Sequence, residues 1–290
     1  MVDSVSYWAE EYNLDGFRFD LMGLHDLYTM QNVESAVHTI NPQAVIYGEG
    51  WTMGSTITNV PQANQTNISK ITPTNNAIGA IAVFNDAIRD ALKGSVFTKT
   101  AKGFISGNTS SEVIGKVQFG ITGSGTTTAG VSWKVNNSMV VNYMSAHDNN
   151  TLWDKLLLSN PDDSEADRVK MNKLGAAIIM ISKGMPFIHA GEEMLRTKDG
   201  EENSYKSSDA INNIDWSVLK EGSIQYETMK YYQGLIEMRK AYDIFRSTTG
   251  LIVVNAKMLD NGAMEVTFRS NISSDKAIVI INPTNQAVSY

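Results

Sequence analysis

Short apolar runs alternate with helix-like segments through roughly the first 245 residues of the chain. Five runs are strand-like, at about 14–21, 44–51, 80–85, 138–148 and 185–191. Helical character is found at about 3–12, 31–40, after residue 85, from Thr151, 164–183 and 223–241. Strands that alternate with helices are typical of parallel βα units. The pattern therefore predicts an α/β fold built on a parallel sheet.

The sequence character changes near residue 250. The runs "LIVVNAKMLDNGAMEVTFRS" and "KAIVIINPTNQAVSY" are strand-like, and "DNG" between two strands is a hairpin turn pattern. We predict two domains, a βα domain over 1–249 and an antiparallel β domain over 250–290. Residues 52–78, rich in Thr, Asn and Gln, are expected to be loop, and residues 98–137, rich in Gly, Ser and Thr, are expected to be a long excursion without strand or helix.

Composition excludes several classes of function. The net charge of −7 argues against nucleic-acid binding, which selects basic surfaces. No apolar run reaches the roughly 18 residues that a membrane span needs, so we expect no membrane partner. The chain has no cysteine, which excludes disulfides and thiolate metal sites. The compartment stays open, with a bacterial cytoplasm slightly favoured.

Charged residues stand inside the first strand-like run, "LDGFRFDLMG". Residues i and i+2 of a strand face the same way, so Arg18 and Asp20 share one face while Phe17 and Phe19 share the other. If helices cover one face of a buried strand, the phenylalanines pack there and the Arg18–Asp20 pair points inward. A buried ion pair is a poor stabiliser, so this arrangement favours a functional site.

Carboxylates also stand at the C-terminal ends of three predicted strands, as Asp20, Glu49 and Asp148. In an α/β barrel that end carries the chemistry. Each residue alone has a structural explanation, as an ion-pair partner or a helix cap, but three together favour an active site. Glycoside hydrolysis needs two carboxylates with opposite duties. Asp20 beside Arg18 suits the ionised role, and Glu49 between two glycines suits the protonated role.

Three segments carry a resemblance to a known family. "DGFRFDLMG", "YGEGW" and "VNYMSAHDNNTLWDKL" resemble, in this order, the second, third and fourth conserved regions of the α-amylase superfamily. The exact residues of these segments resemble those of type I pullulanases. The segments "FNDAIRDALKGSVF", "GMPFIHAGEEMLRTKDGEENSY" and "INNIDW" show the same resemblance. The resemblance implies a partial (β/α)8 TIM barrel, about strands four to eight, followed by an incomplete antiparallel β domain. It also implies hydrolysis of α-1,6 linkages in pullulan and branched starch or glycogen.

The resemblance assigns a role to each candidate catalytic residue. Asp20 is expected to be the nucleophile, Glu49 the general acid/base and Asp148 the third acid. His147 is expected to hydrogen-bond the same sugar as Asp148, and Arg18 to orient Asp20.

Further residues are candidates for holding the substrate. Aromatic side chains near strand ends can stack on glucose, and Trp51 follows the acid motif directly. Tyr205 resembles a pullulanase loop residue, with Asn203 beside it. Trp153 is a weaker candidate, because a tryptophan on a helix is more often part of the core.

No metal or other cofactor is expected. No His/Asp/Glu group has zinc spacing, and although calcium is common in the superfamily, no Asp-rich loop here specifies it. Of the other three histidines, His25 is expected to make a polar contact, His38 to lie on the surface and His189 to be structural.

The resemblance covers only part of a barrel. The first conserved region, the "YNWGYDP" signature and three strands are not found in this chain. We therefore expect a fragment that needs a partner half-barrel, or that self-associates through open sheet edges, with little activity alone. The expected partner is an α-glucan. Isoamylase-like debranching, mixed α-1,4/α-1,6 cleavage and a non-catalytic glucan-binding role remain alternatives.

Overall fold

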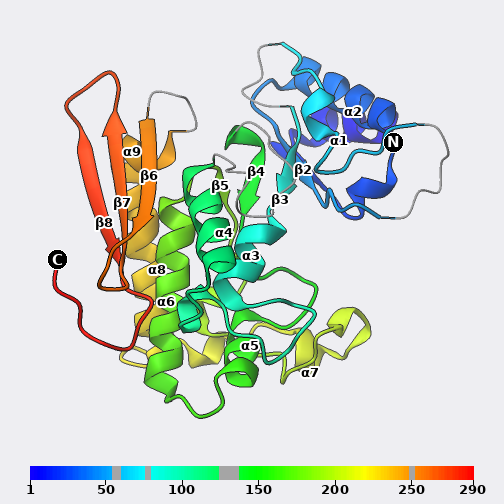
Figure 1. The fold of residues 1–290 in the computed structure, drawn as a ribbon. Coiled ribbons are helices and arrows are strands. Elements are labelled where there is room, and N and C mark those ends of the chain that lie inside the picture. The colour runs from blue at the N-terminus through cyan, green and yellow to red at the C-terminus, as the bar shows by residue number, and fades with distance from the viewer. Residues whose placement is uncertain (54–59, 76–79, 124–136, 248–251) are drawn as a thin grey trace. The chain divides into compact units, whose positions relative to one another are not determined.

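The computed structural model describes residues 1–53, 60–75, 80–123, 137–247 and 252–290 (Figure 1). The chain divides into two compact units. The first unit contains the described residues up to Asn85 together with residues 137–141. The second unit contains the other described residues. Among the helices in these ranges, none is both long and apolar enough to cross a bilayer.

The first unit consists of βα elements. Its helices are α1 (Val2–Tyr12) and α2 (Leu27–Ile40), and its strands include β1 (Gly16–Phe19), β2 (Val45–Gly48) and β3 (Ala82–Phe84). The α2 helix begins where the Asp26 side chain accepts a hydrogen bond from the Thr29 N–H, an N-cap. The α2 side chains Met30, Val33 and Val37 are fully buried. Their helical spacing explains why this segment forms an amphipathic helix.

The parallel strands follow the order β1-β2-β3-β4-β5, where β4 is Val140–Asn142 and β5 is Met185–Pro186. The register pairs Arg18 with Tyr47, Tyr47 with Ala82, and Val83 with Val140. The last residue of β4, Asn142, belongs to the second unit, where its carbonyl accepts a hydrogen bond of 2.9 Å from the Phe187 N–H. The predicted α/β fold with a parallel sheet is therefore confirmed.

The first strand is less buried than the sequence suggested. All four residues of β1 are half-buried, and the Asp20 side chain just beyond its end is 56% exposed. The expectation of a buried strand is wrong, because among the described strands β1 has one neighbour, β2, and lies at an edge of the sheet. An edge strand has one side without a paired neighbour, and burial falls accordingly.

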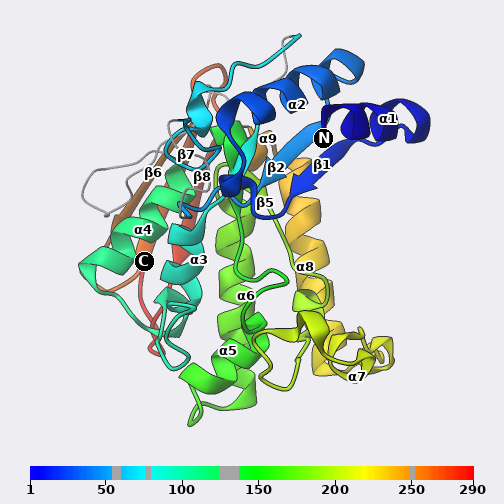
Figure 2. The same ribbon diagram turned by 90° about the vertical axis from the view of Figure 1, so that its right-hand side faces the viewer.

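The second unit contains most of the helices. They are α3 (Asp86–Lys93), α4 (Ser111–Thr122), α5 (Leu152–Ser159), α6 (Glu165–Ile181), α7 (Asp209–Asn212), α8 (Ile224–Ala241) and α9 (Asp243–Arg246). Figures 1 and 2 show α6 and α8 side by side in this unit.

The helix α4 was not predicted, because its segment was assigned to a loop. Its sequence "SEVIGKVQFGIT" contains two glycines and several β-branched residues, which are weak helix formers. Packing stabilises it instead. A Cβ on Gly120 would lie 2.2 Å from the Ile88 side chain of α3, so the glycine permits the close approach of the two helices.

The C-terminal strands form a separate antiparallel sheet of β6 (Ile252–Met258), β7 (Met264–Ser270) and β8 (Lys276–Ile281). Gly262 in the predicted "DNG" turn has φ +85°, which favours glycine. Phe268 of β7 is buried, 5.0 Å from the Phe245 ring of α9, so the sheet shares a core with the helices of the second unit. The predicted boundary at 249/250 lies outside the described residues and stays a prediction.

The parallel strands are shorter than their apolar runs. The run 44–51 contains β2, 138–148 contains β4 and 185–191 contains the two residues of β5. In each case the chain leaves the sheet before the polar residues at the C-terminal end of the run. The predicted loop 52–78 contains a short 3-10 helix, η2 (Ile68–Lys70), and parts of that loop lie outside the described residues.

His38 was expected on the surface, and this prediction is wrong. It is buried on α2, where its Nδ1 lies 2.7 Å from Glu34 Oε1 and its Nε2 lies 3.0 Å from the Ala44 carbonyl. Glu34 also accepts hydrogen bonds from the N–H and hydroxyl of Thr74. Because a residue four positions earlier on the helix can satisfy the imidazole, burial costs little here.

Candidate active site

Arg18 joins the two carboxylates at the ends of β1 and β2. Its Nη1 donates to Asp20 Oδ1 at 2.9 Å, and its Nη2 donates to Glu49 Oε1 at 2.9 Å. The planar guanidinium presents its donors in a fixed geometry, so one side chain fixes the position of both carboxylates. The predicted contact between Arg18 and Asp20 is present, and the contact between Arg18 and Glu49 is additional.

The sheet positions Glu49 by its main chain and its side chain. The Glu49 N–H donates to the Phe19 carbonyl at 3.0 Å, and the Glu49 carbonyl accepts from the Gly23 N–H at 2.8 Å. Its second carboxylate oxygen, Oε2, accepts from the Leu21 N–H at 3.0 Å. The chain turns at Leu21, whose φ is +49°. Residues at the end of β1 and just after it thus contact both the main chain and the side chain of Glu49.

The two carboxylates lie close together in unequal environments. A carboxylate oxygen of Asp20 lies within 4.8 Å of one of Glu49. The Asp20 side chain is 56% exposed, whereas that of Glu49 is 7% exposed. Carboxyl groups about 5–5.5 Å apart are typical of retaining glycosidases. The pair can therefore supply one accessible nucleophile and one sheltered proton donor.

Aromatic rings lie around this pair. The Arg18 guanidinium lies 5.6 Å from the centre of the Phe84 ring, a cation–π distance. Phe84 in turn lies 5.7 Å from the Tyr47 ring and 6.5 Å from the half-buried Trp51 ring. The sequence interpretation missed Phe84 as a site residue. Its position at the end of β3 was the available indication.

The second unit contains His147 and Asp148. His147 Nε2 lies 3.7 Å from Asp148 Oδ1, and both side chains are more than half exposed. They lie on the segment between β4 and α5, just before Asn149, whose φ is +62°. The α5 helix begins directly after this segment, where the Thr151 hydroxyl caps the Asp154 N–H. The neighbouring elements thus fix both ends of the segment that carries the pair.

The predicted substrate residues Asn203 and Tyr205 lie on the long segment that follows β5. Both are exposed, and Lys206 Nζ lies 5.1 Å from the centre of the Tyr205 ring. Their exposure is compatible with a contact to substrate. His189, on the same segment, was expected to be structural. Burial lowers its pKa to about 4, so it is neutral at physiological pH.

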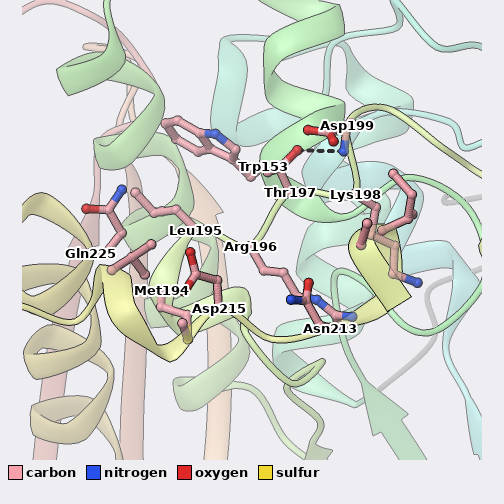
Figure 3. Close-up of a pocket in the computed structure, with 13 residues that line it drawn as sticks. Trp153, Met194, Leu195, Arg196, Thr197, Lys198, Asp199, Asn213, Asp215 and Gln225 are labelled. Carbon is pink, nitrogen blue, oxygen red and sulfur yellow. Dashed lines mark hydrogen bonds between the residues drawn. The ribbon is translucent and has the colours of Figure 1, made fainter. Parts of the chain in front are cut away.

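A pocket of about 390 Å³ also opens on this segment (Figure 3). Its walls combine an aromatic ring, apolar side chains and charged groups, and they are formed by Trp153, Met194–Asp199, Ala210, Ile211, Asn213, Asp215, Val218 and Gln225. The Asp199 N–H donates to the Thr197 hydroxyl at 2.9 Å and closes a tight turn in the wall. Among the described lining residues, Trp153 is the one that was a candidate, a weaker one, for holding the substrate.

Among the described residues of the first unit, Asp20 and Glu49 have carboxylates placed so that they could attract a cation. Any metal ion there would compete with the Arg18 guanidinium, which already donates to both carboxylates. The donor set therefore suits acid–base chemistry between the two carboxylates.

The fold and the carboxylate pair define a class of protein. Parallel βα units that carry paired carboxylates at strand ends are the architecture of glycoside hydrolases built on (β/α)8 barrels.

Comparisons with known proteins identify the group within that class, although no family model matches the chain. A pullulanase of Bacillus subtilis (strain 168) is 38% identical over 246 residues, which cover 85% of this chain and 33% of that protein. Pullulanase A of Streptococcus pneumoniae serotype 2 is 30% identical over 290 residues, which cover 85% of this chain and 22% of that protein. The chain thus spans a third or less of the length of these curated relatives.

Solved structures agree. Pullulanase from Bacillus acidopullulyticus superposes with a TM-score of 0.84 at 35% identity, covering 97% of this chain and 34% of that chain. Pullulanase from Paenibacillus barengoltzii, in complex with maltohexaose and α-cyclodextrin, gives a TM-score of 0.87 at 35% identity. The match covers 98% of this chain and 43% of that chain. By descent the chain belongs with the pullulanases, and it corresponds to a part of them. The predicted partial barrel followed by a β domain is confirmed.

Proposed function

We propose that this chain carries the nucleophile and the acid/base of a retaining, pullulanase-type hydrolase of α-1,6-glucosidic linkages. One observation carries the proposal. Two carboxylates at the ends of adjacent parallel strands lie within 4.8 Å of each other and are bridged by one arginine. That separation leaves room for a sugar carbon to bond to one carboxylate while the other reaches the glycosidic oxygen.

The unequal exposure of the pair assigns the roles. Asp20, the exposed member, attacks the anomeric carbon and forms a glycosyl–enzyme bond as the C1–oxygen bond breaks. Glu49, the sheltered member, gives its proton to the leaving oxygen and then takes a proton from the water that cleaves the intermediate. Arg18 holds both carboxylates in place.

The remaining candidates are proposed as substrate contacts. Asp148 is proposed as the third acid and His147 as a hydrogen-bonding partner of the same sugar, on the resemblance of their motif. Trp51 is proposed to stack on a glucose face, because aromatic rings bind the apolar faces of sugars. Asn203 and Tyr205 are proposed as outer contacts, and their exposure supports this.

The substrate is proposed to be an α-glucan. Structural neighbours of this chain were solved with maltohexaose and α-cyclodextrin, with maltotetraose and with maltose. These ligands were bound by those proteins, and the matched segments cover 38–43% of those chains. We propose that this chain acts on pullulan and on branched starch or glycogen as part of a complete barrel.

A chimera tests the proposal directly. This chain replaces the segment of the Bacillus subtilis pullulanase that it matches, and hydrolysis of pullulan is measured by reducing ends and product chromatography. We expect maltotriose, the product of α-1,6 cleavage. Asp20→Asn and Glu49→Gln should each abolish turnover, whereas Asp15→Asn, which removes an exposed carboxylate before β1, should leave it unchanged. Panose-like products would indicate α-1,4 cleavage instead. A folded chimera without turnover would refute the proposal.

Affinity electrophoresis in pullulan separates catalysis from binding for the chain alone. We expect pullulan in the gel to retard the migration of the chain, and we expect the Asp20→Asn and Glu49→Gln variants to be retarded equally. The chain alone should release few reducing ends. Retardation together with an inactive, folded chimera would favour the alternative of a glucan-binding module.

A further inference from the structure

A buried polar cluster in the second unit contains a carboxyl group that the proposed chemistry does not use. Its members are Glu192, on a 3-10 turn (Glu192–Met194) after β5, Ser145 after β4, Asn172 on α6 and Tyr232 on α8. All four are buried. A buried carboxyl group is costly unless each of its oxygens has a partner, so the partners of Glu192 indicate what it does.

Each oxygen of Glu192 meets a hydroxyl group. The Ser145 Oγ donates to Oε2 at 2.5 Å, and the Tyr232 hydroxyl lies 3.3 Å from Oε1. The Tyr232 hydroxyl also donates to Asn172 Oδ1 at 3.0 Å. The Asn172 amide then donates back to the Glu192 carbonyl at 3.4 Å. The cluster is a closed network between four segments of the second unit.

Counting protons shows which form of Glu192 completes the network. Tyr232 has one hydroxyl proton and two acceptors within reach, of which Asn172 is the nearer. It cannot donate to both. A proton on Glu192 Oε1 removes the conflict, because Glu192 then donates to Tyr232 while Tyr232 donates to Asn172.

The electrostatic surroundings favour the same form. Burial raises the pKa of Glu192 to about 7. The charged groups that act on it are Lys93 of α3, which favours its ionisation, and the adjacent Glu193, which opposes it. Tyr232 of α8 and Ser145 hydrogen-bond it, and α6 contributes the uncharged Asn172. At mildly acidic pH the cluster therefore holds a neutral carboxyl group.

The cluster borders the segment that carries two proposed catalytic residues. Ser145 stands two and three positions before the exposed His147 and Asp148. At the other end of the segment, the Asn150 side chain donates to the Gly200 carbonyl at 3.0 Å. The segment 145–150 is thus pinned at both ends to residues of the stretch 192–200, with an exposed middle.

We propose that Glu192, in its protonated form, is a positioning residue that holds Ser145 and thereby fixes the segment bearing His147 and Asp148. It touches neither of these residues; it acts through Ser145. The catalytic role of Asp148 rests on the proposed function, whereas the anchoring of the segment 145–150 does not.

Hydrogen exchange of the whole chain tests the anchoring. Peptides that cover 144–150 are followed from pH 5.5 to 8.5 by mass spectrometry, corrected for the intrinsic pH dependence of exchange and compared with peptides of β7. We expect the protection of 144–150 to fall roughly tenfold as Glu192 loses its proton, since a buried charge and an unpaired contact then replace a satisfied network. The β7 peptides should not follow this change.

Variants separate the proton from the shape of the side chain. Glu192→Gln is neutral and can both accept from Ser145 and donate to Tyr232, so it should keep the protection at every pH. Ser145→Ala should lose protection at every pH while the β7 peptides stay protected. Glu193→Gln, the matched control, should retain the pH dependence. If Glu192→Gln follows the wild-type pH profile, or if the wild type shows no local change, the proposal is wrong.

The outcome is distinguishable from a failure of the proposed function. An inactive chimera with the predicted exchange profile would contradict the catalytic role of the segment 145–150. It would still support the anchoring of that segment by Glu192. In an active chimera, we expect kcat to fall less steeply above about pH 7 in Glu192→Gln than in the wild type, with KM little changed. A kcat–pH profile that is the same in Glu192→Gln and in the wild type would contradict the positioning role.

Discussion

Lys93 has an unusual environment for a lysine. Its side chain is 1% exposed at the end of α3, and its ammonium has the Asn150 carbonyl, at 3.4 Å, as its hydrogen-bond acceptor among the described residues. Burial lowers its pKa from 10.5 to about 7, and the nearby Arg89 acts in the same direction. We predict that Lys93→Met, which keeps the length of the side chain and removes the charge, stabilises the protein.

The size of the effect follows from proton linkage. The difference between 10.5 and about 7 corresponds to about 5 kcal/mol of destabilisation by the charged form. Below pH 7 both the folded and the unfolded states carry the proton, so the cost is fully present there. Between pH 7 and 10.5 the unfolded state binds more protons, so the stability of the wild type rises with pH. The advantage of the methionine variant should therefore shrink by about 1.4 kcal/mol per pH unit above pH 7.

The assay is urea unfolding, followed by tryptophan fluorescence at pH 6, 8 and 9.5. Lys170→Met serves as control, because Lys170 on α6 is 76% exposed in an ion pair with Asp167. This control should change the free energy of unfolding by less than about 1 kcal/mol at each pH. A gain for Lys93→Met that does not decrease with pH would refute the desolvation argument. A loss at pH 6 would show that the contact with Asn150 outweighs desolvation.

Three further substitutions test separate parts of the fold by the same unfolding assay. Phe268→Ala should lower the free energy of unfolding by about 3–5 kcal/mol, because the ring is fully buried in the shared core. Glu34→Ala should cost about 3 kcal/mol, since it leaves His38 and Thr74 without their acceptor; a neutral result would show that water replaces it. Gly23→Ala should destabilise the end of β1, because its Cβ would lie 2.1 Å from the Trp51 carbonyl; an unchanged unfolding midpoint would contradict this.

Sequence periodicity predicted most of the elements. The strands β1 to β5 lie within the five apolar runs, and the "DNG" turn joins β6 and β7. The α6 and α8 helices match their predicted ranges to within two residues. These features are encoded locally, in alternation, helical spacing and turn residues, and so they can be read without knowledge of distant contacts.

Where local preference and packing disagree, the sequence interpretation failed. The α4 helix contains weak helix formers, and its contact with α3 through Gly120 is a property of two segments together. His38 is polar, but its burial depends on acceptors that the fold brings to it. Tertiary contacts override propensity in both cases.

The sequence by itself determined which residue types stand at the ends of the strands, since Asp20, Glu49 and Asp148 follow apolar runs whatever the packing. Only the tertiary structure decided that Arg18 donates to both Asp20 and Glu49, and that Asp20 is exposed while Glu49 is sheltered. It also decided that Glu192 meets Ser145 and Tyr232 in one buried network. Hydrogen bonds between segments some 30 to 50 residues apart depend on strand register and helix packing, which no local pattern of residues specifies.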